Sequence, residues 1–234
     1  MRKSRKIAAK WNLFFSYSQL IINIIKGLII VPLYLKFIGI EMYGFWLATG
    51  NIIVWISFVD PGISNVVQQR VAFFLGKNDK KSLSKTITSG LILSLVIGIL
   101  AYFIGKFLFL FLPSLIIIDD PLKLSSLSQS YNLATIGVSL QLMAFGIVAI
   151  LLGTLRIIIP GIISITANII AIFVNITLLF NDFGLISIAL MQLIIGGITL
   201  FCNLVYMVFV MRKENLQFDY DFIFLKNFSK IFSY

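Results

Sequence analysis

Apolar residues run along the chain in six long blocks, approximately 13–35, 42–59, 87–112, 132–153, 157–180 and 184–211. Each block is close to the ~20 residues that a helix needs to cross about 30 Å of hydrocarbon. A backbone in lipid must satisfy its own hydrogen bonds, and none of the blocks shows the alternating polarity of barrel strands. The pattern therefore predicts an all-α integral membrane protein with six transmembrane helices.

Polar stretches divide the chain into a basic tail (1–12), a transmembrane region (13–211) and a second tail (212–234). Between the second and third blocks, residues 60–85 are amphipathic. We expect the second helix to continue, kinked, through Asp60-Pro61-Gly62 and to line a wet cavity or the cytoplasmic mouth. A separate short interfacial helix is the alternative.

The composition supports a membrane protein and excludes several classes of site. Of 234 residues, 59% are apolar and 12% are charged, which is too apolar for a soluble domain of this size. The chain has no histidine and one cysteine, Cys202, which excludes an intrachain disulfide, histidine catalysis and cysteine or histidine metal clusters. We expect no metal and no cofactor.

Basic residues alternate between the loops. Of the 19 Lys and Arg residues, 15 lie in four segments: the N-terminal tail, the 60–85 segment, the loop at Arg156 and the C-terminal tail. The other loops hold only Lys36 and Lys123. By the positive-inside rule, both termini are cytoplasmic. Because these cations flank membrane segments, the net charge of +10 does not indicate nucleic-acid binding.

Polar residues recur at helical spacing within the apolar blocks. In the first block they fall within an arc of about 80°. The four stripes are Asn12, Ser16, Gln19, Asn23 and Lys26; Asn132, Thr135, Ser139 and Gly146; Gly161, Ser164, Asn168, Ala171 and Asn175, extended by Asp182; and Gln192, Gly196, Thr199 and Asn203. Four stripes favour a shared hydrated interior, and helix packing is the alternative. In 87–112, Gly90, Ser94, Gly98, Ala101 and Gly105 form a face that we interpret as packing.

Lys26 is central in its block, too far from either end for its side chain to reach water. We interpret it as an anion site, with an ion pair to Asp60 as the alternative. Lys106 lies near the outer end of its block, and there we expect the side chain to extend toward the interface.

A family resemblance lies in residues 38–79, IGIEMYGFWLATGNIIVWISFVDPGISNVVQQRVAFFLGKND. A short turn ends in Glu-x-Tyr-Gly-x-Trp, a helix ends in Asp-x-Gly, and a stretch with Gln and Arg closes on Gly-Lys-Asn-Asp. This pattern resembles the bacterial polysaccharide-biosynthesis flippases, the Wzx-type O-antigen transporters, which share a superfamily with MATE antiporters and lipid II flippases.

The resemblance implies a transporter of two six-helix lobes in the bacterial inner membrane, of which this chain is the N-terminal lobe. Its substrate would be an oligosaccharide on an undecaprenyl-diphosphate-type lipid, moved without chemical change. A second lobe and other polysaccharide-assembly proteins would be its partners. The substrate-binding residues would be Lys26, Arg70, Asp60, Asn23 and Gln19.

Two departures from the family pattern stand out. Pro61 occupies a position where the family usually has a bulky apolar residue, and the sequence contains six blocks where the family has about twelve. The tail FDYDFIFLKNFSKIFSY is similar to a cytoplasmic lead-in to a seventh helix, so we expect an incomplete half. Two alternatives stay open: a MATE-like small-cation antiporter lobe, which would need deep acidic residues, and a membrane-embedded polysaccharide polymerase, which would need a large charged outer loop.

Overall fold

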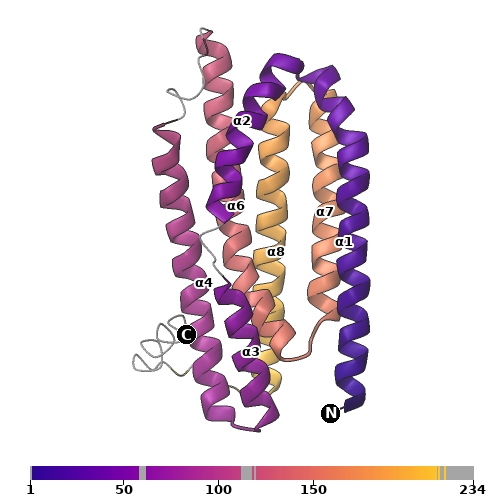
Figure 1. The fold of residues 1–234 in the computed structure, drawn as a ribbon, viewed down its shortest axis with the longest axis vertical. Coiled ribbons are helices and arrows are strands. Elements are labelled where there is room, and N and C mark those ends of the chain that lie inside the picture. Colours follow the sequence, from indigo (N-terminus) through magenta and orange to yellow (C-terminus); the bar gives the residue numbers. More distant parts are fainter. Residues whose placement is uncertain are drawn as a thin grey trace.

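The computed structural model describes residues 2–57, 62–111, 118, 120–214, 216 and 219. Within these residues every regular element is an α-helix. The elements are α1 (Arg2–Phe37), α2 (Ile40–Ser57), α3 (Ile63–Gly76), α4 (Lys80–Phe109), α6 (Pro121–Gly153), α7 (Ile158–Phe180) and α8 (Leu185–Lys213). The long helices run up and down beside one another in an antiparallel bundle (Figure 1).

Five of these helices are long and apolar enough to cross a membrane, namely α1 from Lys6 onward, α4, α6, α7 and α8. They coincide with five of the six predicted blocks, so the described chain is all-helical, as predicted, and fits a multi-pass membrane protein. The remaining block, 42–59, is helical over Ile40–Ser57. That α2 spans the membrane, and that the bundle is one lobe of two, stay predictions.

The predicted continuation of the second helix through Gly62 is wrong. Gly62 has φ 99°, a left-handed conformation that cannot belong to a right-handed helix, and α3 begins immediately after it. The amphipathic stretch is therefore a separate helix. It buries Val67 and Val71 against α4 and α6.

Basic segments gather at one end of the bundle. The start of α1, the α3–α4 turn, the α6–α7 loop and the end of α8 all lie at the lower end in Figure 1, hereafter the basic end. There, Arg156 forms an ion pair of 2.6 Å with Glu214. At the opposite end Lys123 pairs with Glu41, also at 2.6 Å. The structure thus separates the ends as the charge pattern predicts, and which end is cytoplasmic stays a prediction.

Small residues bring the central helices into close contact. A Cβ atom on Gly196 of α8 would collide with the carbonyl oxygen of Gly137 on α6, and one on Gly146 would collide with Ser94 of α4. Gly90, Ser94, Gly98, Ala101 and Gly105 of α4 are all buried, which confirms the packing interpretation of that face. The centre of the bundle is therefore α4–α6–α8.

Helix α1 lies at the edge of the bundle, next to α7 (Figure 1). Its outward side chains are apolar and exposed, including Ile21, Ile25 and Leu28, the last with 72% of its surface accessible. In a membrane this surface faces lipid. The opposite surface of α1 carries the polar stripe.

Candidate functional site: a polar cavity beside α1

A cavity of approximately 540 Å³ lies between α1, α6, α7 and α8. Every member of the predicted α1 stripe lines it, so the spacing correctly predicts that this face turns toward the other helices. The α1 wall consists of Asn12, Phe15, Ser16, Gln19, Asn23 and Lys26.

The opposite walls come from α7 and α8. On α7 the cavity reaches Gly161, Ser164 and Asn168, and on α8 it reaches Gln192, Thr199 and Asn203. The upper members of the α7 stripe, Ala171, Asn175 and Asp182, do not line it, and Gly196 is used for contact with α6. Three of the four predicted stripes therefore converge on one polar space, although not over their whole lengths.

The predicted α6 stripe does not line the cavity, and this expectation is corrected. Thr135 and Ser139 donate hydrogen bonds to carbonyls of their own helix, and Gly146 packs against Ser94 of α4. Gln141 lines the cavity instead. It follows Ser139 by two residues, about 200° around the helix, so the two lie on nearly opposite faces. The sequence signal for this cavity residue was a single glutamine, Gln141, outside the predicted α6 stripe.

Lys26 is half-buried and lines the cavity at mid-bundle. Within the described residues its ammonium makes no hydrogen bond or ion pair, and no described lining residue carries a carboxylate. Asp60, its alternative partner, lies outside the described residues. The ammonium is thus free, within that part of the chain, to meet water or an anion in the cavity.

Arg70 is not brought to the same place. It lies half-buried on α3, which packs on α4 and α6, and it is not among the residues that line the cavity. Arg70 therefore does not line this cavity together with Lys26. A binding role for Arg70 stays a prediction.

The cavity reaches the basic end and is closed toward the other end. Its lining includes Asn12 and Ile157, which lie near the basic end. At the far end of α1, the Tyr34 hydroxyl donates to Asn175 Oδ1 over 3.1 Å, and the Tyr34 and Tyr43 rings are 5.3 Å apart. Phe37 and Phe180 make an edge-to-face contact at 5.0 Å. These aromatic contacts join α1, α2 and α7 above Lys26.

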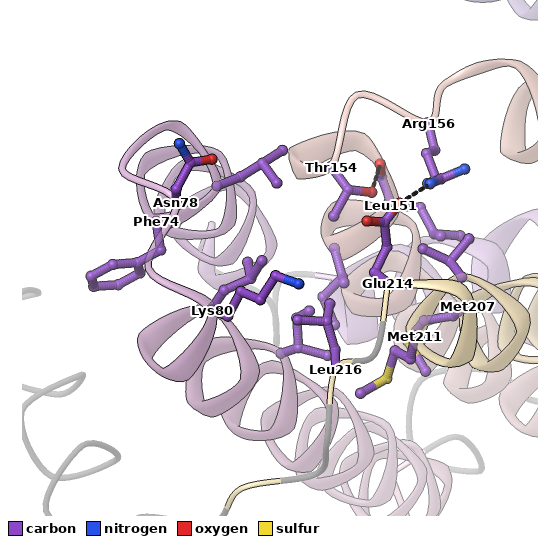
Figure 2. Close-up of a pocket in the computed structure, with 15 residues that line it drawn as sticks. Phe74, Asn78, Lys80, Leu151, Thr154, Arg156, Met207, Met211, Glu214 and Leu216 are labelled. Carbon is purple, nitrogen blue, oxygen red and sulfur yellow. Dashed lines mark hydrogen bonds and ion pairs between the residues drawn. The ribbon is translucent and has the colours of Figure 1, made fainter.

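A second, smaller cavity of approximately 180 Å³ opens at the basic end between α3, α4, α6 and α8 (Figure 2). Its wall is mainly aliphatic, including Leu83, Ile87 and Ile150. At its rim, the Arg156–Glu214 pair joins the α6–α7 loop to the end of α8. Because the wall of this smaller cavity is mainly aliphatic, the larger cavity is the candidate site for a polar ligand.

The other lysine within a long apolar helix, Lys106, has a different environment from the one predicted. Its Nζ donates to Asn132 Oδ1 of α6 over 2.7 Å and lies 5.8 Å from the centre of the Tyr102 ring. It is half-buried. Lys106 thus contacts a neighbouring helix, where we expected simple extension toward the interface.

Comparison with models of protein families, with curated proteins and with solved structures yields no match to this chain.

Proposed function

We propose that the chain takes part in moving an isoprenoid-diphosphate-linked oligosaccharide across the membrane, without changing it chemically, for cell-surface polysaccharide synthesis. The observation that supports this most is Lys26, a cation without a described partner in a polar cavity of a membrane-spanning bundle. Such a position is expensive in lipid unless water or a ligand compensates it. A diphosphate would supply that compensation.

The physical task is to lower the cost of carrying a charged head group through hydrocarbon. An unpaired charge in a low-dielectric medium costs tens of kcal/mol in the Born limit. A cavity lined by a lysine and several amides offers substitute hydrogen bonds, and charge-assisted bonds are the strongest of these. Lysine binds phosphate as a point charge with rotatable donors, which suits transient binding. The isoprenoid chain would remain in the bilayer.

The geometry offers less support for the two alternatives. A small-cation antiporter would need carboxylates in the cavity, and none of the described lining residues is acidic. A polymerase would need catalytic acids or bases near a polar ligand, and the polar side chains among the described lining residues are amides, hydroxyls and one lysine. The same proposal includes a location in the inner membrane of a bacterium. Its partners would be a second six-helix lobe and other polysaccharide-assembly proteins.

The test uses cells whose surface glycan depends on this protein. Lys26→Gln should abolish surface glycan at normal expression, whereas Lys26→Arg should retain part of it because the positive charge remains. Full glycan export by the Gln variant would contradict the proposal.

A further inference from the structure

Ser164 of α7 holds two amide side chains of the cavity in a fixed orientation. Its hydroxyl oxygen accepts a hydrogen bond from Gln19 Nε2 of α1. Its carbonyl oxygen accepts from Asn168 Nδ2 over 2.9 Å. Both amide nitrogens are thus directed to Ser164, and both amide oxygens are directed away from it.

These two amide oxygens are unused acceptors in the cavity. All three residues line it, and Asn168 is only 8% exposed. Within the described chain, neither Gln19 Oε1 nor Asn168 Oδ1 accepts a hydrogen bond. An amide oxygen can accept two hydrogen bonds, so these free acceptors on residues of the cavity wall can take donors supplied from the cavity.

The position of Lys26 decides which donor suits this place. Gln19 precedes Lys26 by seven residues, two helical turns, so both lie on one face about 10 Å apart along the axis. Gln19 is the nearer to the basic end. A metal or ammonium ion would also suit carbonyl oxygens, but the same cavity holds Lys26 and has no described carboxylate. Hydroxyl groups carry donors without charge and fit these surroundings better.

We infer that Gln19 and Asn168, oriented by Ser164, form an acceptor subsite that binds hydroxyl donors of the ligand next to the anionic group held at Lys26. This inference rests on the proposed function and adds to it the orientation of the ligand in the cavity. The anionic group lies deepest in the bundle, and the hydroxyl-bearing part lies toward the basic end.

The experiment measures binding of two probes to the purified 234-residue chain: farnesyl diphosphate, and farnesyl diphosphate carrying one N-acetylglucosamine. The wild type should bind the glycosylated probe up to about tenfold more tightly, the worth of a net hydrogen bond or two. Asn168→Leu, similar in size without the acceptor, should remove this preference. Ser164→Ala, which frees only Gln19, should reduce the preference in part.

Thr177→Val serves as the control, because Thr177 is an exposed hydroxyl of the same helix outside the cavity. It should retain the full preference. Equal wild-type affinity for the two probes, or an unchanged preference in a well-folded Asn168→Leu variant, would overturn the subsite alone. Binding of farnesyl diphosphate that requires sodium and is lost in Asn168→Leu would also overturn the subsite, because the amide oxygens would then bind a cation. Lack of wild-type binding to either probe, or farnesyl diphosphate binding unaffected by Lys26→Gln, would overturn the proposed function and the subsite with it.

Discussion

Lys26 and Lys106 both lie inside long apolar helices, but their surroundings differ. At the α4–α6 interface, Lys106 meets the Asn132 amide oxygen at 2.7 Å and lies near the Tyr102 ring. On α1, Lys26 lines an open polar cavity and has no partner within the described residues. An ammonium in a membrane helix is costly unless something compensates it. The protein supplies that compensation for Lys106 and leaves it to water or a ligand at Lys26.

The largest effect is expected where the close contact between α6 and α8 is disturbed. Gly196→Leu would place a side chain against the Gly137 carbonyl, and because this contact is with backbone, the helices must separate. We expect loss of most folded protein after detergent extraction, measured by size-exclusion chromatography. The matched control is Gly197→Leu, since a Cβ at Gly197 meets nothing within 4 Å. Equal yields of the two variants would contradict the α6–α8 contact.

The same substitution should lower stability at Lys106 and not at Lys26. Lys106→Met removes a hydrogen bond from a charged donor and leaves Asn132 Oδ1 unpaired, so we expect a loss of about 1.5–3 kcal/mol of stability. Lys26→Met removes a cation that lacks a described partner, so stability should be unchanged or increased. Thermal unfolding in one detergent measures both. A similar loss in both variants would show that Lys26 has a structural partner.

Closure of the bundle above Lys26 should depend on Tyr34. Tyr34→Phe keeps the ring contacts and removes the hydroxyl that donates to Asn175, a fully buried residue whose Nδ2 has no partner among the described residues. We expect a loss of about 1–3 kcal/mol of stability. A cysteine-reactive probe added from the basic end should also reach further along α1. Unchanged stability and unchanged labelling would remove Tyr34 from the closure.

The smallest effect is expected at the Arg156–Glu214 pair. Both side chains are partly exposed, at 28% and 50%, and such pairs contribute about 0–1 kcal/mol. Arg156→Gln should therefore change the unfolding temperature little, and less at high salt. A loss of stability as large as that of Lys106→Met would contradict this description of the pair as a weak, partly exposed contact.

The sequence predicted the site best where one helix carries one polar stripe. On α1, five polar residues share a face and most of the residues between them are apolar, so burial of that face followed from periodicity. On α6, polar residues occupy two faces, and periodicity selected the one that packs on α4. At 60–62, helix continuation and helix restart fit the sequence equally well. The left-handed backbone at Gly62 decides in favour of a restart.

Local sequence also could not reveal the role of Ser164. Gln19 and Ser164 are 145 positions apart, and their contact depends on how α1 packs on α7. The same holds for Lys106 and Asn132, which come from different predicted helices. Periodicity identifies which face of a helix is polar, whereas the partner of each polar group depends on tertiary packing.

Hydration of the cavity from the basic end up to the level of Lys26 is the feature on which the proposed site depends. It is tested with single cysteines at Asn23 and Leu28 in a Cys202→Ala background. Both positions have exposed side chains, but Asn23 lines the cavity and Leu28 belongs to the apolar outer surface. A charged, membrane-impermeant thiosulfonate added at the basic end should label Asn23→Cys and leave Leu28→Cys unmodified. An Asn23→Cys variant as unreactive as Leu28→Cys would contradict a hydrated cavity.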